Sequence, residues 1–262
     1  MTVGNFATTG KILDCLYPPE EFRLITAYGP LGYGKSTLSC KIVVDVLKIW
    51  YRHTSLDYDD PEELDFRAWE MLKQFIVFHP EQFFQKLQDV REISETQRIP
   101  SLIWDDAGLW LYALDWNDPF IIRVGKYMNV ARSRLGSVIM TTPTPDYIFK
   151  KIRKFPQAIN LSIYKVTGKK TGIGPYLRQA KAYLQYYNIV KGYRVRGPIY
   201  YEDFSCLMPD WFFEWYKPLR DAYEKIALDM MMEEWDKTKE KSDVLDLKRY
   251  KELQVPKLTF KA

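Results

Sequence analysis

Cysteine and histidine are scarce in this chain, with three and two residues among 262. Cys15, Cys40 and Cys206 lie far apart and form no C-x-x-C spacing, which argues against a zinc knuckle or a disulfide framework. No apolar run reaches the roughly 18 residues of a membrane-spanning helix, and the first residues lack the pattern of a signal peptide. We therefore expect a soluble cytoplasmic protein in which Cys40 is a small buried hydrophobic residue.

Acidic residues are missing from one long stretch. Between Lys150 and Arg196 the chain has twelve lysines and arginines and no acid, although it has 34 acidic residues in total. Six tyrosines are interleaved with these cations. Because cations contact phosphates and exposed tyrosines stack on bases, the pattern predicts DNA binding. A contact with the acidic surface of another subunit, and tyrosines buried in strands, are the alternatives. The candidate DNA contacts are Lys169, Lys170, Arg178, Lys181, Arg194 and Arg196.

Size and composition indicate a globular protein. Hydrophobic residues make up 47% of the chain and aromatic residues 16%, which is enough for a sizeable core. The length allows one α/β domain with an appendage. We expect an N-terminal arm over residues 1–20, a core domain over 21–166, and a basic β-hairpin with a C-terminal helical extension over 167–262.

Residues 29–36 match a phosphate-binding loop. They read Gly-Pro-Leu-Gly-Tyr-Gly-Lys-Ser and fit the P-loop pattern G-x-x-x-x-G-K-[ST] at every fixed position. Glycines allow backbone N–H groups to turn toward a phosphate without Cβ clashes. Lys35 would neutralise the β- and γ-phosphates of ATP, and the Ser36 hydroxyl would bind Mg²⁺. The predicted nucleotide-binding residues are Gly29, Pro30, Leu31, Gly32, Tyr33, Gly34, Lys35, Ser36 and Thr37.

The segments around this loop have the pattern that it requires. Residues 22–28 are rich in strand-forming side chains, and residues 35–53 place their apolar side chains on one helical face. A helix that begins at Lys35 directs the positive end of its dipole at the phosphates. Strand, loop and helix together argue against the alternative of a chance glycine-rich loop.

Two carboxylates follow an apolar run. Residues 98–104 have the composition of a buried parallel strand, which would deliver Asp105 and Asp106 to its carboxyl edge. Asp105 is then predicted to hold Mg²⁺ through water. Asp106 would face the water site and act as a general base or orient the water. The alternative is that the paired acids only end the strand.

Further elements alternate along the chain. We expect strands over 137–142 and 158–166, and helices over 62–78, 80–97, 117–134 and 145–153. This alternation predicts a three-layer α/β fold with a mainly parallel sheet. Near the C-terminus, residues 182–201 predict a β-hairpin with turns at 191–192 and 197–198. A long helix is expected over 218–240, with Pro218 at its start.

The P-loop and the acid-tipped strand resemble the ASCE division of P-loop ATPases, which includes AAA+, RecA-like and HerA/FtsK-like proteins. The resemblance implies a further strand between these two, with Thr141 or Thr142 as its polar sensor residue. It also implies an arginine that a neighbouring subunit places on the γ-phosphate. Arg153 is the candidate, with Arg132 and Arg134 as alternatives. ASCE proteins usually have Asp-Glu where this chain has Asp105-Asp106, and the shorter side chain reaches less far.

Residues 131–153 look similar to ATPases of archaeal viruses and plasmids that are DnaA-like or Zot/HerA-like. The resemblance covers about residues 20–165 and implies a Mg²⁺-dependent ATPase that acts with DNA, in replication initiation, DNA transport or packaging. It also implies an oligomer with nucleotide bound, in the host cytoplasm if the protein is viral. A P-loop kinase of a nucleotide or small acceptor, and a nucleotide-switched adaptor, are the alternative hypotheses.

Overall fold

The computed structural model describes residues 6–54, 60–93, 98–166 and 176–241, and it divides into two compact units, Met1–Trp215 and Tyr216–Ala262. The helices of the first unit are α1 (Ala7–Leu16), α2 (Lys35–Thr54), α3 (Pro61–Leu72), α4 (Pro80–Ile93), α5 (Ala107–Trp110), α6 (Pro119–Met128) and α7 (Lys150–Arg153). Three short 3₁₀ turns are η1 (Lys73–Phe75), η2 (Ala131–Ser133) and η3 (Pro145–Tyr147). Helix α8 (Asp210–Lys241) begins in the first unit and continues into the second.

One seven-stranded sheet organises the first unit, in the order β2-β3-β4-β1-β5-β6-β7. Its strands are β1 (Arg23–Tyr28), β2 (Ile76–Val77), β3 (Ile99–Trp104), β4 (Leu135–Thr142), β5 (Ile159–Lys165), β6 (Leu177–Asn188) and β7 (Gly192–Ser205). The five neighbouring strands β2, β3, β4, β1 and β5 pair in parallel. Strands β6 and β7 extend the sheet beyond β5 through antiparallel pairs. The predicted mainly parallel α/β fold is confirmed, and β4 lies between β1 and β3 as the ASCE resemblance implied.

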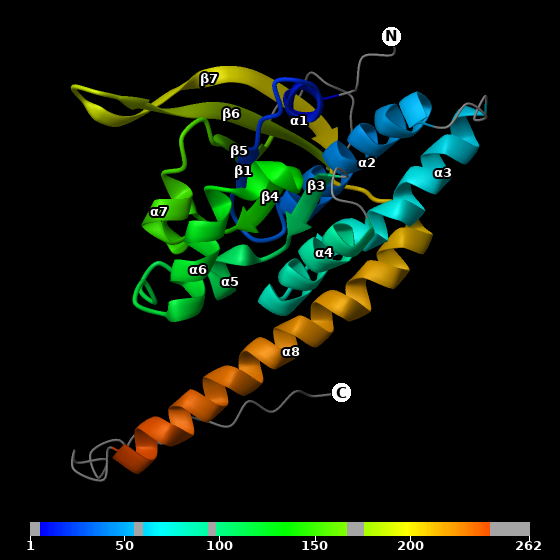
Figure 1. Ribbon diagram of the computed structural model, residues 1–262. Coiled ribbons are helices and arrows are strands. Elements are labelled where there is room, and N and C mark those ends of the chain that lie inside the picture. Colours follow the sequence, from blue (N-terminus) through cyan, green and yellow to red (C-terminus); the bar gives the residue numbers. More distant parts are fainter. Residues whose placement is uncertain (1–5, 55–59, 94–97, 167–175, 242–262) are drawn as a thin grey trace. The chain divides into compact units, whose positions relative to one another are not determined.

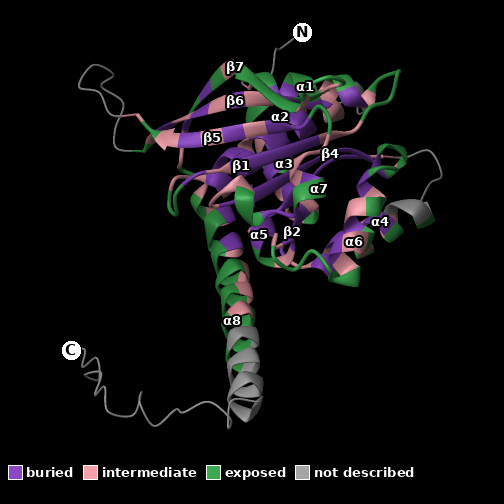
Figure 2. Ribbon diagram, turned by 90° about the vertical axis from the view of Figure 1, so that its left-hand side faces the viewer, coloured by how far each residue is buried: buried purple, intermediate pink, exposed green. Residues whose placement is uncertain are grey.

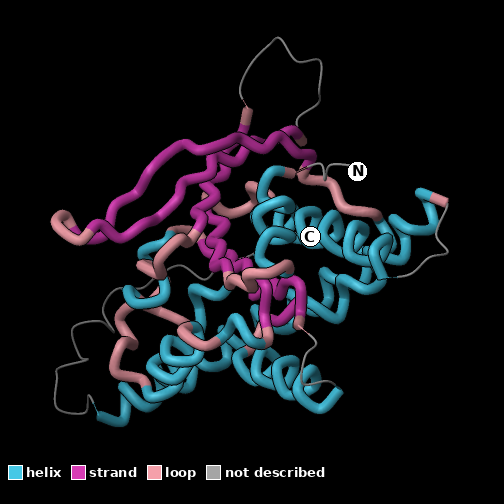
Figure 3. The backbone as a smooth tube through the Cα atoms, turned by 45° about the horizontal axis from the view of Figure 1, so that its top comes forward, coloured by secondary structure: helices cyan, strands magenta, loops and turns pink. Residues whose placement is uncertain are grey.

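Helices cover both faces of the sheet, which makes three layers (Figure 1). Each central strand is buried on both faces, as parallel strands between helical layers must be. On one face, Leu24, Trp104 and Val138 pack with α4, α6 and α7 in one apolar cluster. Helices α1 and α2 contact the sheet too, and Ile12 and Ile42 on them are fully buried. Figure 3 shows the strands in magenta as a layer that continues into the β6–β7 hairpin.

The hairpin is more exposed than the centre of the sheet. Figure 2 shows buried residues, in purple, concentrated on β1, β4 and β5, whereas β7 is largely green. Ile189 and Val190 at the hairpin tip are 91% and 90% exposed. The predicted turn at 197–198 is wrong, because both residues lie inside β7. Near this position the pairing register between β6 and β7 shifts, between Ala182 and Leu184.

Two segments at the ends of the predicted core differ from expectation. The region expected to be an N-terminal arm contains α1, whose Thr8, Thr9, Ile12 and Cys15 are buried. The long C-terminal helix begins at Asp210, so Pro218 lies inside it and not at its start. The helix begins before the proline because the residues upstream of it pack into the core. Phe212 is fully buried, and its ring centroid lies 4.7 Å from that of Trp69.

The remaining differences concern short elements. Strand β2 lies inside the segment predicted as helix 62–78, because two residues are too short to give an alternating pattern. The predicted helix 145–153 is instead η3 and α7, separated by Ile148 and Phe149. Ile148 forms a β-bridge with Tyr112. Helix α6 ends at Met128, earlier than predicted, and a 3₁₀ turn follows it.

Candidate nucleotide site

The predicted P-loop joins β1 to α2, at the carboxyl edge of the parallel strands. Gly29, Gly32 and Gly34 have φ angles of +153°, +75° and +83°, which side-chain-bearing residues rarely adopt. Space is also limited at two of them. A Cβ at Gly29 would lie 2.6 Å from the Ile163 carbonyl oxygen, and one at Gly34 would lie 2.9 Å from the Cβ of Cys206. The loop therefore needs these glycines for both conformation and packing.

Lys35 is buried under the loop at the first position of α2. Only 6% of it is exposed, and its Nζ donates hydrogen bonds to the carbonyl oxygens of Gly29 at 3.0 Å and Pro30 at 3.1 Å. The ammonium group and the amino end of a 20-residue helix thus lie together at the loop. Both favour an anion at this position.

Asp105 is the centre of a buried hydrogen-bond network at the same edge. It is 1% exposed, and its backbone N–H donates to the Val77 carbonyl oxygen at 2.9 Å, which continues the pairing of β3 with β2. Its Oδ1 accepts hydrogen bonds from Ser36 Oγ at 2.8 Å and from Thr141 Oγ1 at 2.6 Å. Residues from α2, from the end of β3 and from β4 therefore meet at one carboxylate oxygen.

Thr141 also orders the residue that follows Asp105. Its Oγ1 accepts a hydrogen bond from the Asp106 backbone N–H at 2.8 Å. Asp106 is half-buried and adopts a left-handed conformation with φ +50° and ψ +38°. A left-handed residue other than glycine is uncommon, and it persists where its surroundings hold it. The Thr141 hydroxyl is thus bonded to both carboxylate-bearing residues.

The structure separates the two threonines that the sequence left as alternatives. Successive side chains of a strand point to opposite faces. Thr141 points to Asp105, whereas Thr142 Oγ1 donates to the Thr144 carbonyl oxygen at 3.0 Å. Thr142 lies so close to Gly108 that a Cβ there would be 2.6 Å from its hydroxyl oxygen. Thr142 therefore shapes the loop after β4.

The oxygen donors at this edge suit a magnesium ion. Mg²⁺ binds one or two protein oxygens and completes its shell with water and substrate phosphates. Ser36 Oγ and Asp105 Oδ1 are such a pair, next to a cradle for phosphate. Within the described ranges, no cluster of three or more His, Cys, Asp or Glu side chains forms an all-protein metal cage. The residues therefore fit a nucleotide-bound Mg²⁺.

Cys40 lies behind the site on α2 and is 1% exposed, so the prediction of a buried small residue is confirmed. Desolvation by burial, and then the charge of Asp105, raise the pKa of its thiol well above the usual range. The thiol stays neutral and acts as a packing group.

The end of β7 and the residue after it contact the first turns of α2, a contact that sequence reasoning missed. Thr37 Oγ1 donates to the Cys206 carbonyl oxygen at 3.4 Å, and Lys41 Nζ donates to the Ser205 carbonyl oxygen at 2.7 Å. Burial lowers the pKa of Lys41. Because more than 160 residues separate these partners, no local pattern could have indicated the contact.

The candidate arginines occupy two different edges of the sheet. Arg132 and Arg134 precede β4, so they lie at the edge opposite Thr142, roughly 25 Å away at about 3.3 Å per strand residue. Arg153 lies on the P-loop side, at the end of α7, and forms an ion pair with Asp146. Arg153 is therefore the candidate that is nearer to the carboxyl edge.

The predicted DNA contacts are in different environments. Lys169 and Lys170 lie outside the described residues. Arg178 does not fit the expectation, because its side chain is buried and its Nη1 donates to the Leu177 carbonyl oxygen at 2.8 Å. Lys181 lies 4.7 Å from the ring centroid of Tyr164. Arg194 and Arg196 are exposed on β7.

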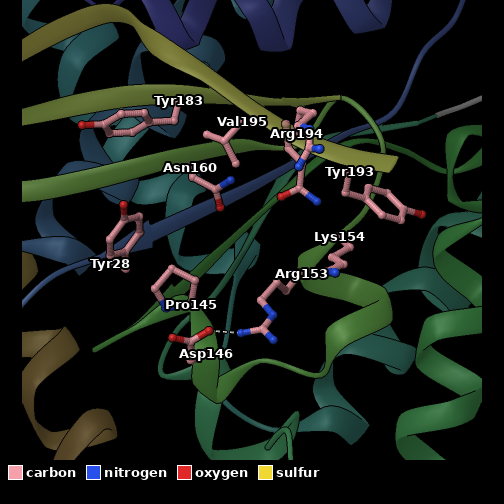
Figure 4. Close-up of a pocket in the computed structure, with 11 residues that line it drawn as sticks. Tyr28, Pro145, Asp146, Arg153, Lys154, Asn160, Tyr183, Tyr193, Arg194 and Val195 are labelled. Carbon is pink, nitrogen blue, oxygen red and sulfur yellow. Dashed lines mark hydrogen bonds and ion pairs between the residues drawn. The ribbon is translucent and has the colours of Figure 1, made fainter. Parts of the chain in front are cut away.

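A groove of about 700 Å³ lies between α7 and the β6–β7 hairpin. Figure 4 shows Asp146 and Arg153 on one side of it, Tyr183 and Arg194 on the other, and Asn160 between them. Tyr28 also lines the groove, and the next residue along the chain, Gly29, begins the P-loop.

Among known proteins, one protein of an archaeal virus is similar in sequence to this chain. No family model matches it. It is 26% identical over 229 residues to the uncharacterized protein B-251 of Sulfolobus spindle-shape virus 1, covering 86% of this chain and 84% of the viral protein. The chain is similar to an archaeal-virus protein. That match confirms the viral part of the resemblance in the sequence.

Solved structures of P-loop proteins are weaker matches. The genome packaging NTPase B204 of Sulfolobus turreted icosahedral virus 2, in complex with AMPPCP, has a TM-score of 0.36 and 13% identity over 70% of this chain and all of its own. The KaiC-like protein PH0186 of Pyrococcus horikoshii has a TM-score of 0.33 and 14% identity over 67% and 89%. At TM-scores below 0.5, these likenesses establish neither a ligand nor a partner for this chain.

Proposed function

We propose that this protein binds ATP with Mg²⁺ at residues 29–37 and hydrolyses it. The observation that supports this most is the convergence on Asp105 Oδ1 of Ser36, from the P-loop helix, and Thr141, from the intervening strand. A simple anion site would need the glycine loop and Lys35 alone. The buried carboxylate beside them adds the group that a nucleotide-bound metal requires.

Each residue has a defined part in this proposal. Lys35 would exchange its carbonyl partners Gly29 and Pro30 for the β- and γ-phosphates. Ser36 and Asp105 would hold Mg²⁺, which when bound neutralises charge on the phosphate oxygens. Asp106 would orient the attacking water, and Thr141 holds its backbone in place. Since Asp106 is shorter than glutamate, this assignment requires the water to lie close to the left-handed turn.

We further propose that hydrolysis is coupled to DNA in a mobile genetic element, within an oligomer that forms with nucleotide. The support is the acid-free basic stretch, the exposed cations of β7, and the similarity to a spindle-shaped-virus protein. Arg153 would act from a neighbouring subunit, and it would have to leave its partner Asp146 to reach a phosphate. In the part of the chain that is described, no helix is long and apolar enough to cross a bilayer.

Phosphate release with and without DNA tests the whole proposal. The wild type should release phosphate from ATP, and DNA should raise the rate. Asp106→Asn should retain binding of a non-hydrolysable ATP analogue but lose turnover. DNA-independent transfer of phosphate to a small acceptor would instead identify a kinase. Equal rates with and without DNA, together with no DNA binding at low salt, would contradict the coupling.

A further inference from the structure

The groove between α7 and the β6–β7 hairpin has a lining suited to a polyanion. Among its lining residues, the one acidic side chain is Asp146, and its partner is Arg153. Two other cations, Lys154 and Arg194, line the groove and have no acidic partner among the described residues. Arg153 and Asp146 neutralise each other, so the two remaining cations give the groove a net positive charge. A positive groove attracts phosphate groups.

Aromatic rings lie among these cations. Tyr28, Tyr183 and Tyr193 come from β1, β6 and β7 and line the same groove. Tyr193 is 40% exposed, and Lys154 Nζ lies 5.5 Å from the centroid of its ring. Cations interleaved with accessible rings are the pattern by which proteins hold a nucleic-acid strand, with phosphates on the cations and bases on the rings.

We infer that this groove binds single-stranded nucleic acid, with its phosphates on Lys154 and Arg194 and a base stacked on Tyr193. A duplex is disfavoured, because its bases stay stacked on one another and are not available to the tyrosine rings. This inference rests on the proposed function in one respect only, that the strand is DNA. The chemistry of the groove itself concerns any unpaired strand.

The groove and the nucleotide site share the loop after β4. Thr141 on β4 bonds to Asp105, and the Pro143 carbonyl oxygen accepts a hydrogen bond from the Gly29 N–H at 3.2 Å. The same loop continues into Pro145 and Asp146, which line the groove. A strand in the groove would therefore contact a segment that is hydrogen-bonded to the first glycine of the P-loop. This contiguity gives a physical route by which the strand can affect hydrolysis.

Fluorescence anisotropy without nucleotide tests the inference. The probes are a labelled oligothymidylate, the matching oligouridylate and a duplex of equal length. Tyr193→Ala should weaken binding of the single strand about ten-fold, and Tyr193→Phe should retain it because the ring remains. Arg194→Ala should lower the slope of log affinity against log salt by about 0.7, while Arg194→Lys retains it. Lys86→Ala, on the partly exposed side of α4, is the charge control outside the groove. Circular dichroism checks that each variant folds.

The outcomes separate this inference from the proposed function. Ring-dependent binding of either single strand supports the groove, and the tighter of the two identifies DNA or RNA. The inference is overturned if Tyr193→Ala and Tyr193→Phe bind the single strand with equal affinity. It is also overturned if the protein prefers the duplex and neither substitution changes that preference. ATP hydrolysis by a protein whose binding of single strands does not depend on the Tyr193 ring would overturn the inference about the groove and leave the proposed ATPase activity intact. Ring-dependent binding by a protein that does not hydrolyse ATP would support the groove and overturn the proposed function.

Discussion

The Thr141 hydroxyl is the most informative group to remove, because it has a hydrogen bond with each of the two acidic residues. It donates to Asp105 Oδ1 and accepts from the Asp106 N–H, and Thr141 is fully buried. Thr141→Val conserves the shape of the side chain and deletes both bonds. A hydrogen bond to a charged group contributes about 1.5–3 kcal/mol, and a buried N–H without a partner costs about 1–3 kcal/mol.

The two losses share one oxygen, so they do not add in full, and we expect about 3 kcal/mol of destabilisation. For a chain of this size that corresponds to a fall of roughly 6–12 °C in the midpoint of thermal unfolding. ATP turnover should fall at least about ten-fold, since a small displacement of a water-orienting group has effects of this order. Circular dichroism melting and phosphate release measure the two effects.

Two matched variants control this experiment. Thr141→Ser keeps the hydroxyl and should retain most of the stability and turnover. Thr142→Val removes the single hydrogen bond to the Thr144 carbonyl oxygen and should cost only about 1 kcal/mol, with a smaller effect on turnover. The assignment of Thr141 as the residue that holds both Asp105 and Asp106 is refuted if Thr141→Val melts within about 2 °C of the wild type. It is also refuted if Thr142→Val lowers stability and turnover more than Thr141→Val does.

Three further predictions follow from the same geometry. Asp106→Asn should bind an ATP analogue as the wild type does and release no phosphate, and retained turnover would place the water-orienting role elsewhere. Gly34→Ala should weaken ATP binding, because a Cβ there meets Cys206 at 2.9 Å in a left-handed backbone; unchanged affinity by calorimetry would show that the loop adapts. Burial raises the pKa of Glu202, whose Oε2 has no hydrogen-bond partner among the described residues, so its ionisation opposes folding as pH rises above about 4.5. Glu202→Gln should therefore be more stable than the wild type in urea at pH 7, with a difference that shrinks toward pH 4; a constant difference would contradict this.

The sequence was sufficient for the centre of the fold because local patterns determine it. The P-loop glycines require a particular backbone, and apolar runs such as residues 99–104 require burial on both faces. Parallel strands place their carboxyl ends together, so Ser36, Asp105 and one of the two threonines that end β4 could be predicted to meet. The choice between Thr141 and Thr142 could not be made, because it depends on which of the two side chains lies on the same side of the sheet as the Asp105 carboxylate.

Long-range packing explains what the sequence did not indicate. The burial of Arg178 results from its place on β6 within the sheet, and its position in a stretch rich in lysine and arginine did not indicate it. Cys206 lies beside Gly34 only because β7 ends next to the P-loop helix. The groove brings together residues from β1, α7 and the β6–β7 hairpin, and no spacing along the chain relates Tyr28 to Tyr193.

Calorimetric titration with a non-hydrolysable ATP analogue and Mg²⁺ tests the central claim most directly. The wild type should bind the analogue, and Lys35→Ala should lose binding, since the proposal assigns neutralisation of the phosphates to this buried ammonium group. Lys48→Ala, on the same helix but paired with Asp65, is the control and should bind as the wild type does. Equal affinity of the wild type and Lys35→Ala would contradict the assignment of residues 29–37 as a nucleotide site.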